Sequence, residues 1–372
     1  MSIPESQKAL IIQSKGSRVV ATTRPVPSPG ANEVLIRVSG SGLNPHDQLI
    51  RDLGIIIQAF PWIPANDLAG TVVKLGPGVT KYAVGDRIFG QSDLHAKVPL
   101  DHNGAQEYAL LRVEASAKIP ASLLKDSSRG SGHSSNGDDA ALTLPTNFVA
   151  AFWALHDDTG HNLPVPALGL KGNGQEFDFS KHDLLIVGGG GRVGQQAVQI
   201  ANRLDGWRKI VVVAGKRNEE ALLKLGATHV IDRSLPVDEQ LKQIRAIVGD
   251  DLVYAIDAIS HDITLAAAAL SNTKQGTVVH LSNVTVDESK IGDKKAGFKY
   301  RFSAGASTKP SSIQLAAKVW DALPTWIDQG KILPAPSSTA FDGLDADKTN
   351  EVLDKYRDGV PVPDHVHIHL NH

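Results

Sequence analysis

The sequence predicts an α/β protein in which a β-rich domain precedes a doubly wound parallel sheet. Short apolar stretches separated by Gly, Pro, Asn and Asp recur from Lys8 to about Lys118, which favours a compact barrel or sandwich. From Asp183, strand and helix patterns alternate over roughly 100 residues, which requires a parallel sheet with right-handed crossovers. A glycine-rich turn joins the first strand of this second region to its first helix.

The composition is that of an ordinary globular protein. With 372 residues, about two to two and a half domains are expected. The 38 Lys and Arg residues nearly balance the 40 Asp and Glu residues, which argues against a nucleic acid or an anionic membrane as partner. Cysteine is absent, which excludes disulfides, thiol nucleophiles and thiolate metal sites, and fits a reducing compartment.

Targeting signals are also absent from the sequence. The N-terminal stretch MSIPESQKALII lacks a basic region followed by a long apolar run, so we expect no signal peptide. No run approaches the roughly 18 uncharged apolar residues that a membrane span needs. We therefore expect a soluble cytoplasmic protein, monomeric or homodimeric, whose partner is a small molecule.

The individual elements follow in order along the chain. The first region has six predicted strands: KALIIQ, VVATTRPVP, EVLIRVSGSG, GTVVKLGPG, DRIFG and EYALLRV. Residues 125–139 are predicted to form a mobile Ser/Gly-rich loop, and Asn162 to His182 an irregular stretch. The second region alternates strands LLIV, KIVVVAG, THVID, LVYAIDAI and TVVHLS with helices RVGQQAVQIANRL, NEEALLKLGA, DEQLKQIRAIV and ITLAAAAL. The tail holds a helix, AAKVWDALPTWI, and a final alternating strand, HVHIHL.

The glycine turn has the spacing of a dinucleotide-binding fingerprint. Gly189-x-Gly191-x-x-Gly194 follows a strand and opens a helix. Glycines at this spacing allow a tight turn, close approach of a pyrophosphate and close packing of helix on sheet. We expect these three residues to bind the cofactor, together with Arg192 and Val193 between them. The alternative is a flexible turn of purely structural importance.

The end of the second strand indicates which dinucleotide is bound. NAD sites usually place Asp or Glu here, where the carboxylate bonds the ribose 2′-hydroxyl. This chain instead reads VVVAGKRNEE, with Lys216 and Arg217 directly after Gly215. Two cations suit a 2′-phosphate, so NADP(H) is the predicted cofactor. Arg233, just past the third strand, is a further candidate, and the alternative for Lys216 and Arg217 is a solvated pair.

Three segments of the first region carry a resemblance to a known superfamily. They are GLNPHD (Gly42–Asp47), the run Pro64–Gly90 and NGAQEYALL (Asn103–Leu111). With the glycine turn, they resemble the medium-chain dehydrogenases/reductases, within the zinc-independent quinone oxidoreductase-like branch. The stretch IVVVAGKRNEEALLKLGATHVIDR is similar to fungal alcohol dehydrogenase-like proteins and trans-acting enoyl reductases.

The resemblance implies a division of the chain into domains. Residues 1–150 would form a GroES-like β-barrel catalytic domain, and residues 151–323 a Rossmann domain that binds NADP(H). Residues 324–372 would return to the catalytic domain.

The resemblance also implies that no zinc takes part in catalysis. Zinc alcohol dehydrogenases hold the metal with two Cys and one His, but here Asn44 stands at the first Cys position. Ala65-Asn66-Asp67 replaces the GHE motif, and Asn147 lies near the third ligand position. These residues are not a good zinc ligand set.

Other histidines leave a second metal arrangement open. His46, Asp67, His95 and His102 are the residues that would form it. His365, His367 and His369 share one face of the final strand, and we expect them to form a solvated edge rather than a ligand set.

The resemblance assigns catalytic roles to two residues after the third strand. Asn44 would face the nicotinamide ribose, and His46 aligns with the hydroxyl residue that relays protons in the zinc enzymes. A histidine titrates in the useful range for such a relay. The alternative for His46 is a loop histidine that caps the turn, and Asp47 is expected to stabilise that turn.

Together these features predict an NADPH-dependent, metal-free reductase. Its acceptor would be an α,β-unsaturated carbonyl or a quinone, and the alternative acceptor is an aldehyde. Some enoyl reductases of this branch carry Tyr or Lys about five residues after Asn44, where this chain has Leu49. A second alternative is therefore a weakly catalytic NADPH-binding protein.

Overall fold

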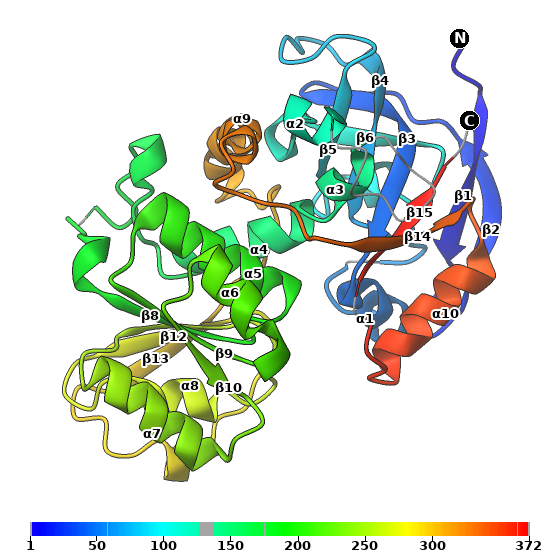
Figure 1. Ribbon diagram of the computed structural model, residues 1–372. Helices are drawn as coiled ribbons and strands as arrows, with labels where there is room; N and C mark the ends of the chain where they lie inside the picture. Colours follow the sequence, from blue (N-terminus) through cyan, green and yellow to red (C-terminus); the bar gives the residue numbers. More distant parts are fainter. Residues whose placement is uncertain (1, 58, 126–136, 175, 363, 371–372) are drawn as a thin grey trace. The chain divides into compact units, whose positions relative to one another are not determined.

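Each of the two units of the chain is built on a large sheet of its own kind, and unit 1 has a two-stranded sheet in addition (Figure 1). The computed structural model describes residues 2–57, 59–125, 137–174, 176–362 and 364–370. Unit 1 consists of Met1–Thr146, Ala306–Asp328 and Pro334–His372. Unit 2 consists of Asn147–Gly305 and Gln329–Leu333.

Unit 2 is built on a six-stranded sheet in which every neighbouring pair is parallel. The strand order is β10-β9-β8-β11-β12-β13. This is the doubly wound order, in which successive strands are added first on one side of β8 and then on the other. This confirms the predicted Rossmann-type fold. The strands are β8 (Asp183–Val187), β9 (Lys209–Ala214), β10 (His229–Asp232), β11 (Tyr254–Asp257), β12 (Gly276–His280) and β13 (Phe298–Phe302).

Helices cover both faces of this sheet, which explains why β8 and β9 are apolar without interruption (Figure 1). On one face, Leu185 and Val211 pack with Ile244 of α7 (Val237–Val248) and Ala267 of α8 (Thr264–Ala269). The opposite face carries α5 (Arg192–Ile200) and α6 (Glu219–Leu225). The helix α4 (Pro145–His156) precedes these elements in the chain.

Unit 1 holds a mostly antiparallel seven-stranded sheet and a two-stranded sheet, which confirms the predicted GroES-like domain. The larger sheet has the order β14-β15-β3-β4-β5-β7, and β6 pairs with β3. The C-terminal strand β15 lies between β14, to which it is parallel, and β3, to which it is antiparallel. The strands are β1 (Ser6–Ile12), β2 (Val19–Pro25), β3 (Glu33–Leu43), β4 (Asp67–Leu75), β5 (Arg87–Gln91), β6 (Tyr108–Arg112), β7 (Ser116–Lys118), β14 (Ser338–Asp342) and β15 (His365–His369).

The helices of unit 1 are mostly short. They are α1 (Pro45–Leu53), α2 (Ala121–Lys125), α3 (Asp138–Leu142), α9 (Ile313–Asp328) and α10 (Ala346–Arg357). Of the loop predicted over residues 125–139, residues 126–136 lie outside the described residues. Asp138 and Asp139 do not belong to a loop, because they begin α3.

Among the described residues, the structure has no helix with the length and apolar character that crossing a membrane requires.

Candidate functional site

The glycine turn of unit 2 lies where β8 ends, at the point where the strand order reverses. A side chain at Gly189 would place its Cβ 2.0 Å from Cγ1 of Val212 on β9. At Gly194 the Cβ would lie 2.5 Å from the carbonyl oxygen of Gly188. Both glycines therefore allow α5 to approach the sheet closely, as the fingerprint predicts.

The N-terminus of α5 supplies hydrogen-bond donors at this turn. Gly191 is its N-cap residue, and glycine has no side chain that could occupy the first N–H groups of the helix. A Cβ at Gly191 would meet only the carbonyl oxygen of Gly188, at 3.4 Å. Packing inside the unit thus does not require glycine here, whereas a close-lying pyrophosphate would.

The three predicted cations gather around the end of β9. Lys216 and Arg217 form a short 3-10 helix directly after Gly215, and both are exposed. The backbone N–H of Arg233 donates to the carbonyl oxygen of Ala214 at 2.9 Å. Its guanidinium Nε lies 3.6 Å from the position that a Cβ on Gly215 would take.

Lys216 has a counter-ion that the sequence reasoning did not consider. Its ammonium group lies 2.5 Å from the carboxylate of Glu219, one turn further on. The hydrogen bond to Glu219 raises the pKa of Lys216, so the lysine stays charged. A phosphate that binds Lys216 has to compete with this carboxylate.

Two further residues at this edge of the sheet were missed. The amide nitrogen of Asn218 lies 2.4 Å from the Cβ position of Gly190, so this side chain packs directly on the glycine turn. Asp257 ends β11 and accepts the backbone N–H groups of Ile259 and Ser260, at 3.2 and 2.7 Å. Burial raises the pKa of Asp257. The only sequence signal for either residue is its place at the carboxyl end of a strand pattern.

In unit 1, Asn44 and Asp47 shape the connection from β3 to α1. Asn44 is the N-cap residue of α1, and its backbone N–H donates to the Asp47 carboxylate at 2.8 Å. The other oxygen of Asp47 accepts the backbone N–H of Ala65 at 2.9 Å. Both oxygens of this buried carboxylate therefore bond to backbone, and Asp47 stabilises the turn as expected.

The side chain of Asn44 is fixed by a buried carboxylate. Its amide nitrogen donates to Asp67 at 2.8 Å, and Thr146 donates to the other Asp67 oxygen through its hydroxyl and its backbone N–H. Burial raises the pKa of Asp67 to about 6, although the hydrogen bonds from Thr146 and Asn44 act in the opposite direction. Asn44 is thus held in one orientation.

His46 lies half-buried on α1 and forms a hydrogen bond with Asn66, the middle residue of Ala65-Asn66-Asp67. Its Nε2 lies 2.7 Å from the side-chain oxygen of Asn66, and the amide nitrogen of Asn66 donates to the hydroxyl of Ser92. Because an amide oxygen only accepts, Nε2 of His46 carries a proton. The ring can then give up a proton from Nδ1 only as an imidazolium.

These donors do not fit a catalytic zinc ion. Asn44 turns its amide nitrogen to Asp67, and Asn66 uses both ends of its amide on His46 and Ser92. Zinc prefers thiolate, imidazole and carboxylate ligands over amides that are already hydrogen-bonded. Asn147, the residue expected near the third ligand position, belongs to unit 2, whereas Asn44 and Asn66 belong to unit 1.

The alternative set of His46, Asp67, His95 and His102 does not come together as a ligand cluster among the described residues. His95 and His102 instead line a cavity of about 660 Å³ in unit 1. Glu33, at the start of β3, also lines this cavity and lies 3.4 Å from His102, whereas Asn44 follows the other end of the strand.

The expectation of a solvated histidine edge is wrong. His365 and His367 are completely buried and His369 is 6% exposed, because β15 is an interior strand of the sheet. The short α3 also brings Asp139 to His367 and His369. The sequence alternation gave the shared face correctly, but it could not show what covers that face.

Comparison with known families gives two matches. Residues 30–121 match the family model "Alcohol dehydrogenase GroES-like domain". Residues 193–307 match "Zinc-binding dehydrogenase".

Curated relatives extend over most of the chain. The dehydrogenase pigH of Monascus ruber is 28% identical over 378 residues, which cover 93% of this chain and 95% of that protein. The trans-enoyl reductase himH of Aspergillus japonicus is 29% identical over 63% of this chain and 60% of its own length. A chloroplast envelope quinone oxidoreductase homolog of Arabidopsis thaliana is 29% identical and covers 64% of each chain.

Solved structures agree on the fold. An alcohol dehydrogenase superfamily protein of Novosphingobium aromaticivorans has a TM-score of 0.72 and 22% identity, covering 98% of this chain and 100% of its own. The mycobacterial protein Rv1454c, solved as a complex with NADPH, has a TM-score of 0.67 and 19% identity, covering 98% and 99%.

Proposed function

Because the chain belongs to the medium-chain dehydrogenase/reductase superfamily, we propose that it is an NADPH-dependent reductase of a small activated acceptor. The acceptor is an α,β-unsaturated carbonyl compound or a quinone, and no metal takes part in catalysis. The observation that carries this proposal is the replacement of zinc-ligand positions by hydrogen-bonded amides in a chain that keeps an intact glycine turn.

The residues of unit 2 fit a dinucleotide. The glycine turn and the N-terminus of α5 would hold the pyrophosphate, where N–H groups and the helix dipole favour an anion. Lys216, Arg217 and Arg233 would hold the 2′-phosphate. The bound cofactor supplies the hydride, and the protein supplies binding, orientation and a proton.

The proton is assigned to His46. Reduction of an enone or a quinone leaves a negative charge on oxygen or on the α-carbon, which a proton must neutralise. The hydrogen bond to Asn66 fixes the ring of His46 through Nε2, so Nδ1 of the imidazolium is the donor atom. Asn44, held by Asp67, is a positioning group for the nicotinamide ribose.

The relatives support this acceptor class. Both a trans-enoyl reductase and a quinone oxidoreductase homolog are about as similar to this chain as the dehydrogenase is. An enone and a quinone share a conjugated carbonyl whose reduction by hydride needs no Lewis acid when a proton donor is at hand. Aldehyde reduction, the second candidate, is the reaction for which a polarising metal helps most.

An acceptor panel with the full-length protein tests the proposal. NADPH absorbance is followed with an enoyl thioester, a simple enone, a benzoquinone and an aliphatic aldehyde, each at the same concentration. Consumption with the enoyl or quinone compounds supports the proposal, and consumption with the aldehyde alone favours the second candidate. Binding of NADPH without consumption by any acceptor would make the chain a cofactor-binding protein of low activity.

A variant of the glycine turn serves as the control. Gly189→Val should abolish consumption, because its side chain would meet Val212 and displace the turn. Consumption that survives in this variant would assign the activity to a contaminant.

A further inference from the structure

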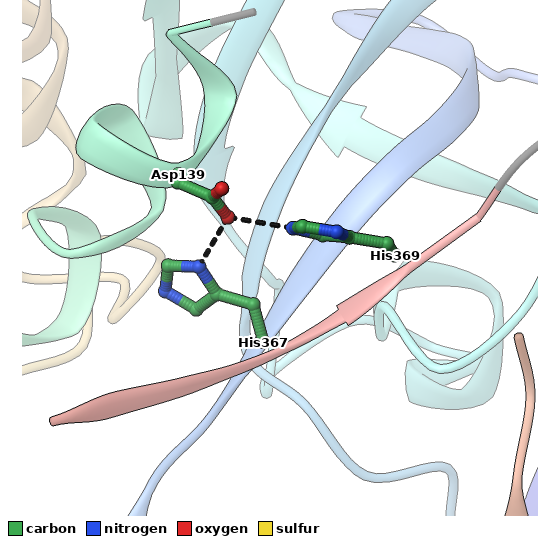
Figure 2. Close-up of side chains that lie close together, drawn as sticks. All are labelled: Asp139, His367 and His369. Atoms are coloured by element: carbon green, nitrogen blue, oxygen red, sulfur yellow. Dashed lines mark hydrogen bonds and ion pairs between the residues drawn. The ribbon is translucent and has the colours of Figure 1, made fainter. Parts of the chain in front are cut away.

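One buried carboxylate in unit 1 binds two histidines at the same oxygen. Figure 2 shows the rings of His367 and His369 directed at one carboxylate oxygen of Asp139. Nδ1 of His367 and Nε2 of His369 both lie 2.7 Å from this oxygen. Alternate residues of a strand share a face, so β15 presents both rings to α3, which carries Asp139.

We propose that Asp139, His367 and His369 form a binding site for a divalent transition-metal ion, with zinc as the ion that fits best. Two imidazole nitrogens and one carboxylate oxygen are ligands that zinc prefers. Within the described part of the chain, no other group of three His or carboxylate side chains has its ligand atoms this close together. The site is separate from Asn44 and His46, and it does not depend on the proposed reductase activity.

The ring nitrogens of His367 and His369 that do not face Asp139 also have polar neighbours. Nε2 of His367 lies 2.9 Å from Nδ1 of His365, and Nδ1 of His369 lies 3.9 Å from the carboxylate of Asp342. Histidines that bind metals characteristically donate their second N–H to such an acceptor, which fixes the tautomer and the ring orientation. His367 therefore has a hydrogen-bonded outer partner on the correct nitrogen, and the carboxylate of Asp342 lies near the corresponding nitrogen of His369, beyond hydrogen-bond distance.

Metal binding replaces the N–H groups that His367 and His369 direct at Asp139. In the metal-free arrangement both rings donate to Asp139, so His365 donates from Nδ1 to Nε2 of His367. A cation bound at Nδ1 of His367 reverses this order, because Nε2–H of His367 then donates to His365, whose own Nε2 lies 3.6 Å from Asp67.

The local charge favours a cation. Burial alone would raise the pKa of Asp139, but the hydrogen bonds from His367 and His369 outweigh burial and hold this pKa below its usual range. Asp139 is therefore ionised and can act as a ligand. The neighbouring Asp138 accepts from Arg87 and Ser39, so the positive charge of Arg87 is paired with Asp138 rather than with Asp139.

The side chains must shift for the ion to enter. With zinc–ligand distances of about 2.0 Å and tetrahedral angles, two ligand atoms lie about 3.3 Å apart. The two nitrogen–oxygen distances, now 2.7 Å, would widen by about 0.6 Å. All three ligand atoms lie within 4.8 Å of one another. Three protein ligands leave a fourth position for water. The ion would link β15 to α3. His367 and His369 are 228 and 230 positions from Asp139 in the sequence.

Equilibrium dialysis of the chelator-treated full-length protein against zinc chloride tests the proposal. We expect about one zinc per chain by elemental analysis. Asp139→Asn and His369→Gln should weaken zinc binding by more than the roughly 10- to 100-fold that loss of an outer partner costs, and Asp342→Asn should fall within that range. His261→Gln, which changes an exposed histidine of unit 2, should bind zinc like the native chain.

Substoichiometric zinc in the native chain, or unaltered binding by Asp139→Asn and His369→Gln, would overturn the proposal. If these variants fail to fold, cobalt(II) titration of the native protein decides instead. A visible spectrum of tetrahedral cobalt that one equivalent of zinc displaces supports the site. A spectrum of octahedral cobalt alone contradicts it.

Discussion

At the scale of single residues, the side-chain amide of Asn66 joins two neighbours in unit 1. Its oxygen accepts a hydrogen bond from His46, and its nitrogen donates to Ser92. An amide that is already hydrogen-bonded in this way is a poor ligand for zinc. The hydrogen bond also fixes the ring of His46, and the proposed proton-donor role of His46 rests on that orientation.

Replacing His46 tests this role. His46→Ala should lower turnover by roughly 10²–10⁴-fold, because the product loses its positioned proton donor. Affinity for NADPH should change little, since the residues that would bind the pyrophosphate and the 2′-phosphate are in unit 2. Steady-state kinetics and cofactor titration measure the two effects separately. An unaltered rate would mean that His46 only caps its turn and that water supplies the proton.

His161 in unit 2 predicts a pH dependence of stability. It is buried beside Tyr254, and its Nε2 lies 3.1 Å from the carbonyl oxygen of Ala255. Burial lowers the pKa of His161 from its ordinary value of about 6.5 to about 4. The unfolded chain then binds more protons than the folded chain between these two values. The stabilising contribution is complete above pH 6.5 and is lost as the pH falls towards 4.

Chemical denaturation across this pH range measures the effect. The free energy of unfolding should fall on acidification by an amount on the order of 3 kcal/mol that is due to His161. His161→Gln keeps a hydrogen-bond donor but cannot titrate, so its stability should vary less with pH. His261→Gln, at an exposed position, should behave like the native protein. Equal pH dependence in all three proteins would contradict the assignment.

At the scale of elements, the turn between β8 and α5 separates packing from ligand binding. A Cβ at Gly194 would lie 2.5 Å from the backbone of Gly188 and Gly189, whereas a Cβ at Gly191 meets only one atom, at 3.4 Å. Glycine at position 194 is needed for the fold, whereas glycine at position 191 is needed only if a pyrophosphate lies close to it.

Two alanine variants test this distinction. Gly194→Ala should destabilise the protein by about 1–3 kcal/mol, because backbone atoms must move apart. Gly191→Ala should leave the melting temperature nearly unchanged but lower NADPH affinity roughly tenfold or more, because the added methyl group displaces the pyrophosphate. Thermal unfolding and fluorescence titration are the measurements. Unchanged NADPH affinity in Gly191→Ala would remove the cofactor from this turn.

The loop after β9 is proposed to set the preference between NADPH and NADH. Lys216, Arg217 and Arg233 should give NADPH at least a tenfold advantage over NADH, because charge-assisted hydrogen bonds to the 2′-phosphate have no counterpart in NADH. Replacing Lys216 and Arg217 by Ala should remove most of this preference and leave NADH kinetics almost unchanged. Glu219→Gln should strengthen it, because Lys216 loses its competing partner.

The ratio of kcat/KM for the two cofactors measures this preference. A double variant that keeps the native preference would assign the phosphate to Arg233, whose guanidinium lies beside Gly215. Equal use of NADH and NADPH by the native protein would contradict the assignment altogether.

Strand and helix patterns predicted most elements, and the exceptions have physical causes. The apolar strands and amphipathic helices of unit 2 were predictable because their periodicity reports burial directly. The helix α1 was missed because its sequence, PHDQLIRDL, is short and mostly polar, although Pro45 begins it and Asp47 accepts from the backbone of its N-cap residue Asn44. The strand β13 was missed because most of its residues are exposed at the edge of the sheet.

The candidate site was predictable only in part. The glycine turn and its cations follow the ends of successive strand patterns, which a parallel sheet brings to the same edge, so the sequence pattern was sufficient to find them. The contact between Asn66 and His46 joins residues 20 positions apart, and the cluster of Asp139 with the C-terminal histidines joins residues more than 200 apart. Contacts over such separations depend on how the strands pair, which composition and periodicity do not report.

For the whole molecule, the two metal questions have different answers. Catalysis is proposed to need no metal, because Asn44 and Asn66 are hydrogen-bonded amides. The cluster of Asp139, His367 and His369 is proposed to bind zinc away from the reacting groups. Elemental analysis alone therefore does not test metal-independent catalysis, whereas turnover after chelation does.

The central claim is that hydride passes from NADPH to an activated acceptor without a metal. The most direct measurement uses NADPH deuterated at C4 of the nicotinamide, a conjugated enone, and full-length protein treated with a strong chelator and verified as folded by circular dichroism. The account predicts unchanged turnover and one deuterium at the β-carbon of the product when the correct face of the cofactor is labelled. Loss of turnover on chelation with the fold intact, or a product without deuterium from either labelled face, would contradict it.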